Sequence, residues 1–120
     1  MKQRKFFPVL MILFFVGIAG RSQDFATTNP SMVKLIGDTL NTKMMVVTFP
    51  PGVTTEVHTH PVSMIYVLEG GTLKAETDDG KTETVTITAG QFVQLPPDPR
   101  HKTTNTGTTP VKIILVEISK

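Results

Sequence analysis

The chain of 120 residues contains three histidines, and they are the side chains best suited to chemistry. His58 and His60 lie two positions apart in a segment rich in Thr and Val. Successive side chains of a β-strand alternate between faces, so an extended segment from Glu56 onward would place Glu56, His58 and His60 on one face. Neutral imidazole nitrogens are good ligands for transition metals. This spacing predicts half of a metal site.

His101 follows a proline-rich turn, 96–99, at the start of another extended segment. In a closed roll of strands, segments distant in sequence meet in the interior. We therefore predict that His58, His60 and His101 bind one divalent transition metal (Fe, Mn, Ni, Cu or Zn) and leave coordination positions open for water or substrate. The alternative is a set of partly exposed histidines that hydrogen-bond their neighbours without a metal. The pattern assigns no catalytic side chain and no organic cofactor.

Cysteine is absent from the sequence. This absence excludes a thiolate nucleophile, a zinc-thiolate site and stabilisation by disulfides. The fold must be held by packing and by any ligand or metal that it binds.

The first 22 residues are typical of an export signal. Lys2, Arg4 and Lys5 precede an apolar run from Phe6 to Gly20, and Gly20-Arg21-Ser22 provides small residues at a cleavage site. A run of about 15 residues is shorter than the roughly 20 that span a bilayer, so a retained anchor is the weaker alternative. We expect a mature, membrane-free protein from Gln23, located in a periplasm or outside the cell.

The mature part carries a small negative charge. Eight Lys and Arg remain against ten Asp and Glu once the four basic residues of the signal are removed, which leaves a net charge of −2. With neither a basic stripe nor an aromatic platform, nucleic acid is excluded as a partner.

Beyond a polar lead-in, Gly, Pro, Asn or Asp interrupts the chain every eight to twelve residues or so, which indicates many short strands. Asp78-Asp79-Gly80 is typical of a tight hairpin turn, and 50–52 and 96–99 are expected to be stiff corners. The expected strands are 32–36, 44–49, 54–60, 64–68, 72–77, 81–88, 92–95, 102–105 and 111–118.

An open sheet of so many strands would expose long edges, so the sequence predicts an all-β, jelly-roll barrel of a single domain. We divide the mature chain into a lead-in with a first strand, 23–42, and the barrel, 43–120. The expected core consists of Val46, Ile65, Val67, Val85, Ile87, Val93, Ile114 and Val116.

The two histidine segments resemble the two motifs of the cupin superfamily. The first motif has Gly, five residues, His-x-His and a later closing Gly; the second has Gly, five residues, Pro, then His and, after three more residues, Asn. The residues that carry the resemblance are Gly52, His58, His60 and Gly70-Gly71 for the first motif, and Gly90, Pro96, His101 and Asn105 for the second. The resemblance extends over about 43–118 and is closest to small single-domain bacterial cupins.

Two positions depart from the family pattern. The motif glutamate, a metal ligand in many cupins, falls at Ser63 or Met64, and a motif glycine is Asp98. Three neutral imidazoles leave a divalent ion with its full charge, which favours an anionic or chelating ligand in the open positions. Glu56 or Gln94 is a candidate for a fourth contact.

The resemblance implies a metal-binding cupin that binds or acts on a small organic molecule. A three-histidine site without a carboxylate is similar to that of cupin dioxygenases, and a metal-dependent isomerase would use the same ligands. The alternative is a binding or sensing barrel without turnover. Small cupins commonly pair, which implies a possible homodimer with 32–36 as an exchanged strand.

Overall fold

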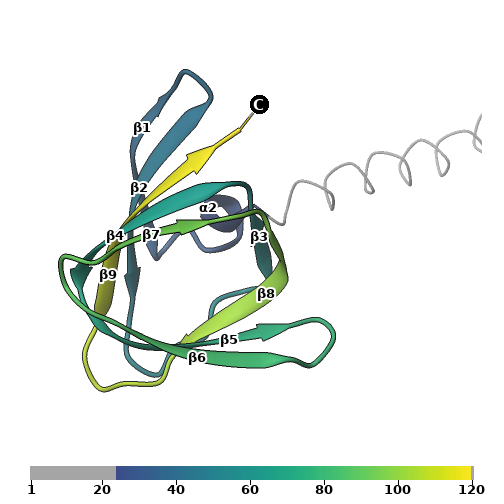
Figure 1. Ribbon diagram of the computed structural model, residues 1–120, viewed down its shortest axis with the longest axis vertical. Helices are drawn as coiled ribbons and strands as arrows, with labels where there is room; N and C mark the ends of the chain where they lie inside the picture. Colours follow the sequence, from purple (N-terminus) through teal and green to yellow (C-terminus); the bar gives the residue numbers. More distant parts are fainter. Residues whose placement is uncertain (1–23, 120) are drawn as a thin grey trace, which may run out of the picture.

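The computed structural model describes residues 24–119, so the predicted export signal, residues 1–22, lies outside the described residues. Two antiparallel sheets face each other in a jelly roll (Figure 1). Between residues 24 and 119 no helix has the length and apolar character needed to cross a membrane. The predicted all-β, single-domain architecture is confirmed.

Five strands form the first sheet. In spatial order they are β1 (Val33–Thr39), β2 (Thr42–Phe49), β9 (Val111–Ile118), β4 (Ser63–Glu69) and β7 (Phe92–Leu95). The central pair β2 and β9 is in register over its whole length, from Thr42 opposite Ile118 to Phe49 opposite Val111.

Four strands form the second sheet. In spatial order they are β3 (His58–His60), β8 (Asp98–Asn105), β5 (Gly71–Thr77) and β6 (Thr82–Ile87). The chain crosses from the first sheet to the second between β2 and β3, between β4 and β5, and between β7 and β8. The first of these crossings carries His58 and His60, and the last brings His101 beside them.

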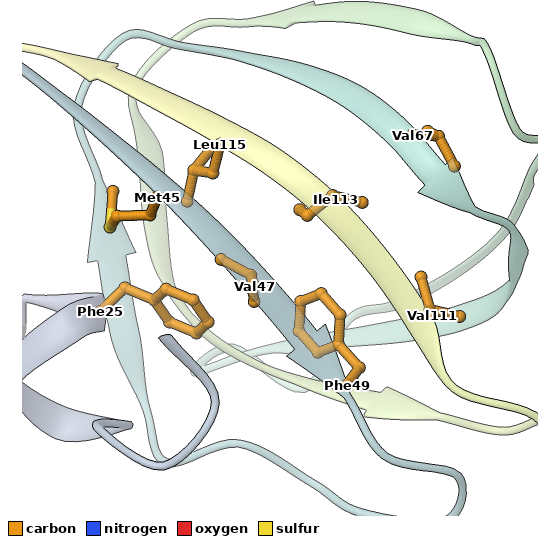
Figure 2. Close-up of a cluster of buried hydrophobic side chains, with 8 residues drawn as sticks. All are labelled: Phe25, Met45, Val47, Phe49, Val67, Val111, Ile113 and Leu115. Carbon is orange, nitrogen blue, oxygen red and sulfur yellow. The ribbon is translucent and has the colours of Figure 1, made fainter. Parts of the chain in front are cut away.

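The buried apolar side chains lie between the sheets and come mainly from alternate positions of β2 and β9. Figure 2 shows this cluster, which consists of Phe25, Met45, Val47, Phe49, Val67, Val111, Ile113 and Leu115. Alternation along each strand turns every second side chain inward, as the pleat requires.

The predicted core was wrong by one position in both central strands. Val46, Ile114 and Val116 are not buried, while their neighbours Met45, Val47, Ile113 and Leu115 are. Both strands carry apolar residues at successive positions, so alternation alone does not distinguish the inner face from the outer one. Of the other predicted members, Val67 is buried, and Ile65 and Ile87 are partly buried and pack against the core. Val93 is partly buried, and Val85 is 43% exposed, so its assignment to the core was wrong.

Two expectations about local structure also change. The strand predicted for 54–60 begins only at His58, because the chain turns and bends through 51–57. The lead-in contains a one-turn helix, α2 (Phe25–Thr28), whose first residue, Phe25, is buried in the core. The Asp24 carboxylate caps this helix by accepting a hydrogen bond from the Thr27 backbone N–H at 3.3 Å.

The turns predicted at 78–80 and 50–52 are confirmed, whereas the corner predicted at 96–99 is limited to 96–97, because β8 begins at Asp98 and not at Lys102. Gly80 adopts a φ of 86° between β5 and β6, and Gly52 a φ of 76° after β2, conformations that glycine tolerates best. Asn105, fully buried, donates from Nδ2 to the backbone carbonyls of Phe49 and Thr109, each at 2.9 Å. Its amide ties the end of β8 to the end of β2.

Gly70, at the crossing from β4 to β5, tests this packing. A methyl group at Gly70 would overlap the Ile87 carbonyl oxygen and lie 3.0 Å from the Thr88 Cα, both backbone atoms that cannot move independently. We expect Gly70→Ala to lower the free energy of unfolding by about 2 kcal/mol in urea titrations. Gly37→Ala is the control, since its methyl group would lie 3.7 Å from Met44 Cβ. Equal stability of the two variants would contradict the packing described here.

Candidate metal centre

The three histidines lie together on the inner side of the second sheet. His58 and His101 are directly paired across β3 and β8. The ring centroids are 4.5 Å apart for His58 and His101, 4.8 Å for His58 and His60, and 5.6 Å for His60 and His101. One nitrogen from each ring lies within 4.8 Å of the others. The fold thus brings together all three predicted ligands.

Two of the rings are oriented by backbone carbonyl groups two residues earlier in the chain. The Nδ1 of His58 donates to the Glu56 carbonyl at 2.7 Å, and the Nδ1 of His101 donates to the Pro99 carbonyl at 2.8 Å. A carbonyl oxygen only accepts hydrogen bonds, so each Nδ1 carries the proton. The lone pair of each neutral ring is therefore on Nε2, where it is free to bind a metal.

The third ring is oriented by a buried carboxylate. The Nδ1 of His60 donates to Oε2 of Glu117 at 2.6 Å, and Glu117 is only 3% exposed. A carboxylate behind a metal-binding imidazole fixes the ring orientation and raises the basicity of the opposite nitrogen. Glu117 also supplies a negative charge close to the three imidazoles.

The sequence analysis did not identify Glu117, although β9 carries a signal for it. Val111, Ile113, Leu115 and Glu117 occupy alternate positions of one strand, and all four are buried. A carboxylate that continues an inward-facing apolar row is seldom buried without a partner. This pattern indicates a functional contact inside the roll.

The described residues fit a divalent metal. The donor set is three imidazoles with the proton fixed on Nδ1, which suits transition metals such as Fe and Zn. Two nitrogens bound to one tetrahedral ion at about 2.1 Å lie about 3.4 Å apart. The nitrogens, now within 4.8 Å of one another, would therefore approach by up to about 1.4 Å on binding. His58, His60 and His101 would hold the ion.

Burial keeps His58 neutral. The side chain is 1% exposed, and removal from water lowers its pKa to about 3. The nearby His60 and His101 lower the pKa further, while the hydrogen bond to the Glu56 carbonyl opposes the shift. At neutral pH His58 therefore has no proton to release from Nε2 when a metal binds.

The N-terminal segment holds the histidine strand in place. Phe25 packs against His58 and His60 at centroid distances of 4.4 and 5.1 Å. The Asn29 Oδ1 accepts a hydrogen bond from the Glu56 backbone N–H at 2.8 Å. Figure 1 shows α2 beside β3. The segment expected to be a polar lead-in thus forms one wall of the site.

The structure does not bring the two candidate fourth ligands to the cluster. Glu56 precedes β3 with an exposed side chain, and Gln94 is exposed, opposite Met64, on the outer face of the first sheet. Of the two positions that correspond to the motif glutamate, Ser63 is buried and lines the inner cavity. Met64 is not among the lining residues. Ser63 is therefore the inward position, and its side chain is a hydroxyl.

A cavity of about 620 Å³ adjoins the three histidines. Its walls come from both sheets and are largely apolar, with Phe49, Leu73, Val93 and Ile113 among them. A cavity of this size accommodates a small organic molecule next to the metal ligands.

The match to a protein family agrees with this geometry. The model of the family described as cupin domain matches residues 45–117, which include all three histidines and Glu117. The chain belongs to the cupin family. No protein of curated function matches it.

Solved structures support the same fold. A cupin domain from Bordetella pertussis Tohama I is 26% identical, with a TM-score of 0.66 over 73% of this cupin and 92% of that chain. The cupin domain of an XRE family transcriptional regulator from Enterobacter cloacae is 21% identical, with a TM-score of 0.57. The match covers 73% of this chain and 95% of that one. A cupin-2 domain protein from Shewanella frigidimarina is 19% identical, with a TM-score of 0.52 over 88% and 92%.

The hydrogen bond between His60 and Glu117 should strengthen metal binding. Glu117→Gln keeps a hydrogen-bond acceptor but removes the charge, so it should weaken metal binding by about 10-fold. Glu117→Ala removes both and should weaken binding more. Competition against a metal chelator measures the affinities. The control is Glu69→Gln, an exposed carboxylate 3.8 Å from Lys112; if it weakened binding as much as Glu117→Gln, Glu117 would have no specific role.

Proposed function

We propose that this cupin binds a divalent transition metal through His58, His60 and His101 and acts on a small organic molecule in the adjoining cavity, in the manner of a dioxygenase. The observation that carries the proposal is the set of three Nδ1 atoms bound to oxygen acceptors. Because each Nδ1 is occupied, Nε2 is the nitrogen of each ring that remains for a shared metal ion, and the three rings line a largely apolar cavity. Structural histidines need no such uniform orientation.

The protein residues supply position and environment. The Glu56 and Pro99 carbonyls and the Glu117 carboxylate hold the three rings, and Phe25 packs over two of them. The largely apolar walls offer a bound molecule contact with hydrocarbon side chains. A metal on three histidines, when bound, supplies a Lewis acid or a redox centre with open coordination positions.

A second candidate function is binding or sensing without turnover. Apart from the histidines, the ionisable side chains lining the cavity within residues 24–119 are Glu83 and Asp98. Reactions that need proton transfer are aided by a positioned acid or base, so this scarcity favours binding. The related domain from Enterobacter cloacae is part of a transcriptional regulator.

The proposal places the protein outside the cytoplasm. Its support is the order of Lys2, Arg4 and Lys5, the apolar run and the small residues at 20–22, which is the pattern of a cleaved export signal.

The proposal also includes self-association into a homodimer. Val46, Ile114, Tyr66 and Phe92 are successive cross-strand neighbours on the outer face of the first sheet. Tyr66 and Phe92 are exposed. A continuous apolar row on an outer sheet face suits contact with a second copy.

Metal content tests the proposed centre. We expect the chain from Gln23 onward to retain Fe, Mn, Ni, Cu or Zn in elemental analysis, and His58→Ala and His101→Ala to lose it, because each variant removes one of three ligands. Glu56→Ala and Gln94→Ala are the controls and should retain the parent's metal content, since both side chains are exposed and outside the cluster. Circular dichroism confirms that each variant is folded. Equal metal content in the parent and all four variants would contradict metal binding by the three histidines.

Oxygen consumption separates the two functions. The metal-loaded parent is assayed with thiols, diketones and catechols, and His101→Ala serves as the inactive control. Consumption that depends on His101 supports the dioxygenase-like enzyme. Saturable binding without consumption supports the binding barrel.

A further inference from the structure

We infer that the cavity selects a molecule with one metal-binding polar end and an uncharged, apolar body, and that the Ser63 hydroxyl forms a hydrogen bond with the polar end. This inference rests on the proposed function, because the polar end is the part that meets the metal. It deepens that function by naming the class of ligand.

The body of the ligand faces apolar side chains. Leu73 and Val85 line the cavity from the second sheet, and Val93, Leu95 and Leu115 line it from the first. Contact with these side chains favours aliphatic or aromatic groups in proportion to the area removed from water. The walls thus suit a hydrocarbon body.

The charge of the walls disfavours an ionised body. None of the cavity-lining residues in the described part of the chain is a lysine or arginine. Arg100 lies in an adjoining hollow, where its Nε donates to Asp78 at 2.7 Å. Glu83 and Asp98 add two carboxylates to the lining. A carboxylate or phosphate on the body would be desolvated without a cationic partner and beside like charge.

The polar end has a specific partner in Ser63. This side chain is 1% exposed, and its Oγ is the sole buried side-chain oxygen or nitrogen within residues 24–119 that has no hydrogen-bond partner. A buried hydroxyl without a partner is unfavourable, so such a group indicates an atom still to be bound. Ser63 lines the same cavity as the histidines.

The register of the strands places Ser63 at the metal end. Ser63 lies directly opposite Glu117 across β4 and β9, and the Glu117 carboxylate holds the ring of His60. Ser63 also lies opposite Leu95 across β4 and β7, at the start of the apolar wall. An oxygen near the metal ligands can reach Ser63 while the rest of the molecule extends along apolar side chains.

A matched pair of catechols tests the selection. Zinc-loaded protein is titrated by calorimetry with tert-butylcatechol and with protocatechuate, which share the chelating head and differ in an apolar or a carboxylate substituent. Zinc is redox-inactive, so the measurement reports binding rather than turnover. We expect at least about 10-fold tighter binding of tert-butylcatechol, since burial of an alkyl group is favourable whereas burial of an unpaired charge is costly.

Ser63→Ala tests the hydroxyl. Loss of one hydrogen bond should weaken the binding of tert-butylcatechol by about 5-fold, which is within the usual range for such contacts. The zinc content should not change. The control is Thr48→Ala, which removes a hydroxyl from the face of β2 opposite to buried Val47 and should change neither quantity.

The outcomes distinguish this inference from the proposed function. Zinc binding with equal or tighter binding of protocatechuate overturns the ligand class and leaves the metal centre standing. Unchanged binding by Ser63→Ala overturns the role of its hydroxyl. Failure of the parent to bind zinc or any other transition metal overturns the proposed function, and this inference with it.

Discussion

The site depends on the fixed protonation of three imidazole rings. Each Nδ1 donates to an oxygen that only accepts, two of them backbone carbonyls and one a buried carboxylate. The His60 bond also joins the two sheets, because His60 is on β3 in the second sheet and Glu117 is on β9 in the first. The spacing between the sheets therefore determines the orientation of His60. The geometry of the candidate metal centre thus depends on how the two sheets pack.

The sequence was informative where a local pattern has one structural solution. The Asp78-Asp79-Gly80 turn and the strands around it followed from backbone preferences, and the two histidine motifs followed from their spacing. It was uninformative where a strand is apolar on both faces: β2 and β9 carry Met44 to Val47 and Ile113 to Val116, so the predicted core shifted by one position. The same ambiguity hid Glu117, whose meaning depends on which face of β9 is inside.

Other features depended on contacts between segments distant in sequence. Phe25 is the one large apolar residue of the stretch 23–30, and only the packing of α2 against β3 makes it part of the site. Glu56 lies outside the cluster because the chain bends before His58. The strand, and with it the alternation of side chains, begins at His58 and does not include Glu56. The sequence marked Ser63 only as one of two positions where the motif glutamate is missing, and its proposed role comes from the absence of a partner for its buried hydroxyl.

Hydrogen bonds within the protein set the tautomers of His58, His60 and His101 before any metal binds. Nitrogen-15 correlation spectra of the metal-free protein at mildly alkaline pH measure this directly, because protonated and unprotonated ring nitrogens have well-separated shifts. The account predicts a protonated Nδ1 and an unprotonated Nε2 in all three rings. A proton on Nε2 of any of the three neutral rings would contradict it, since that nitrogen is the one assigned to the metal.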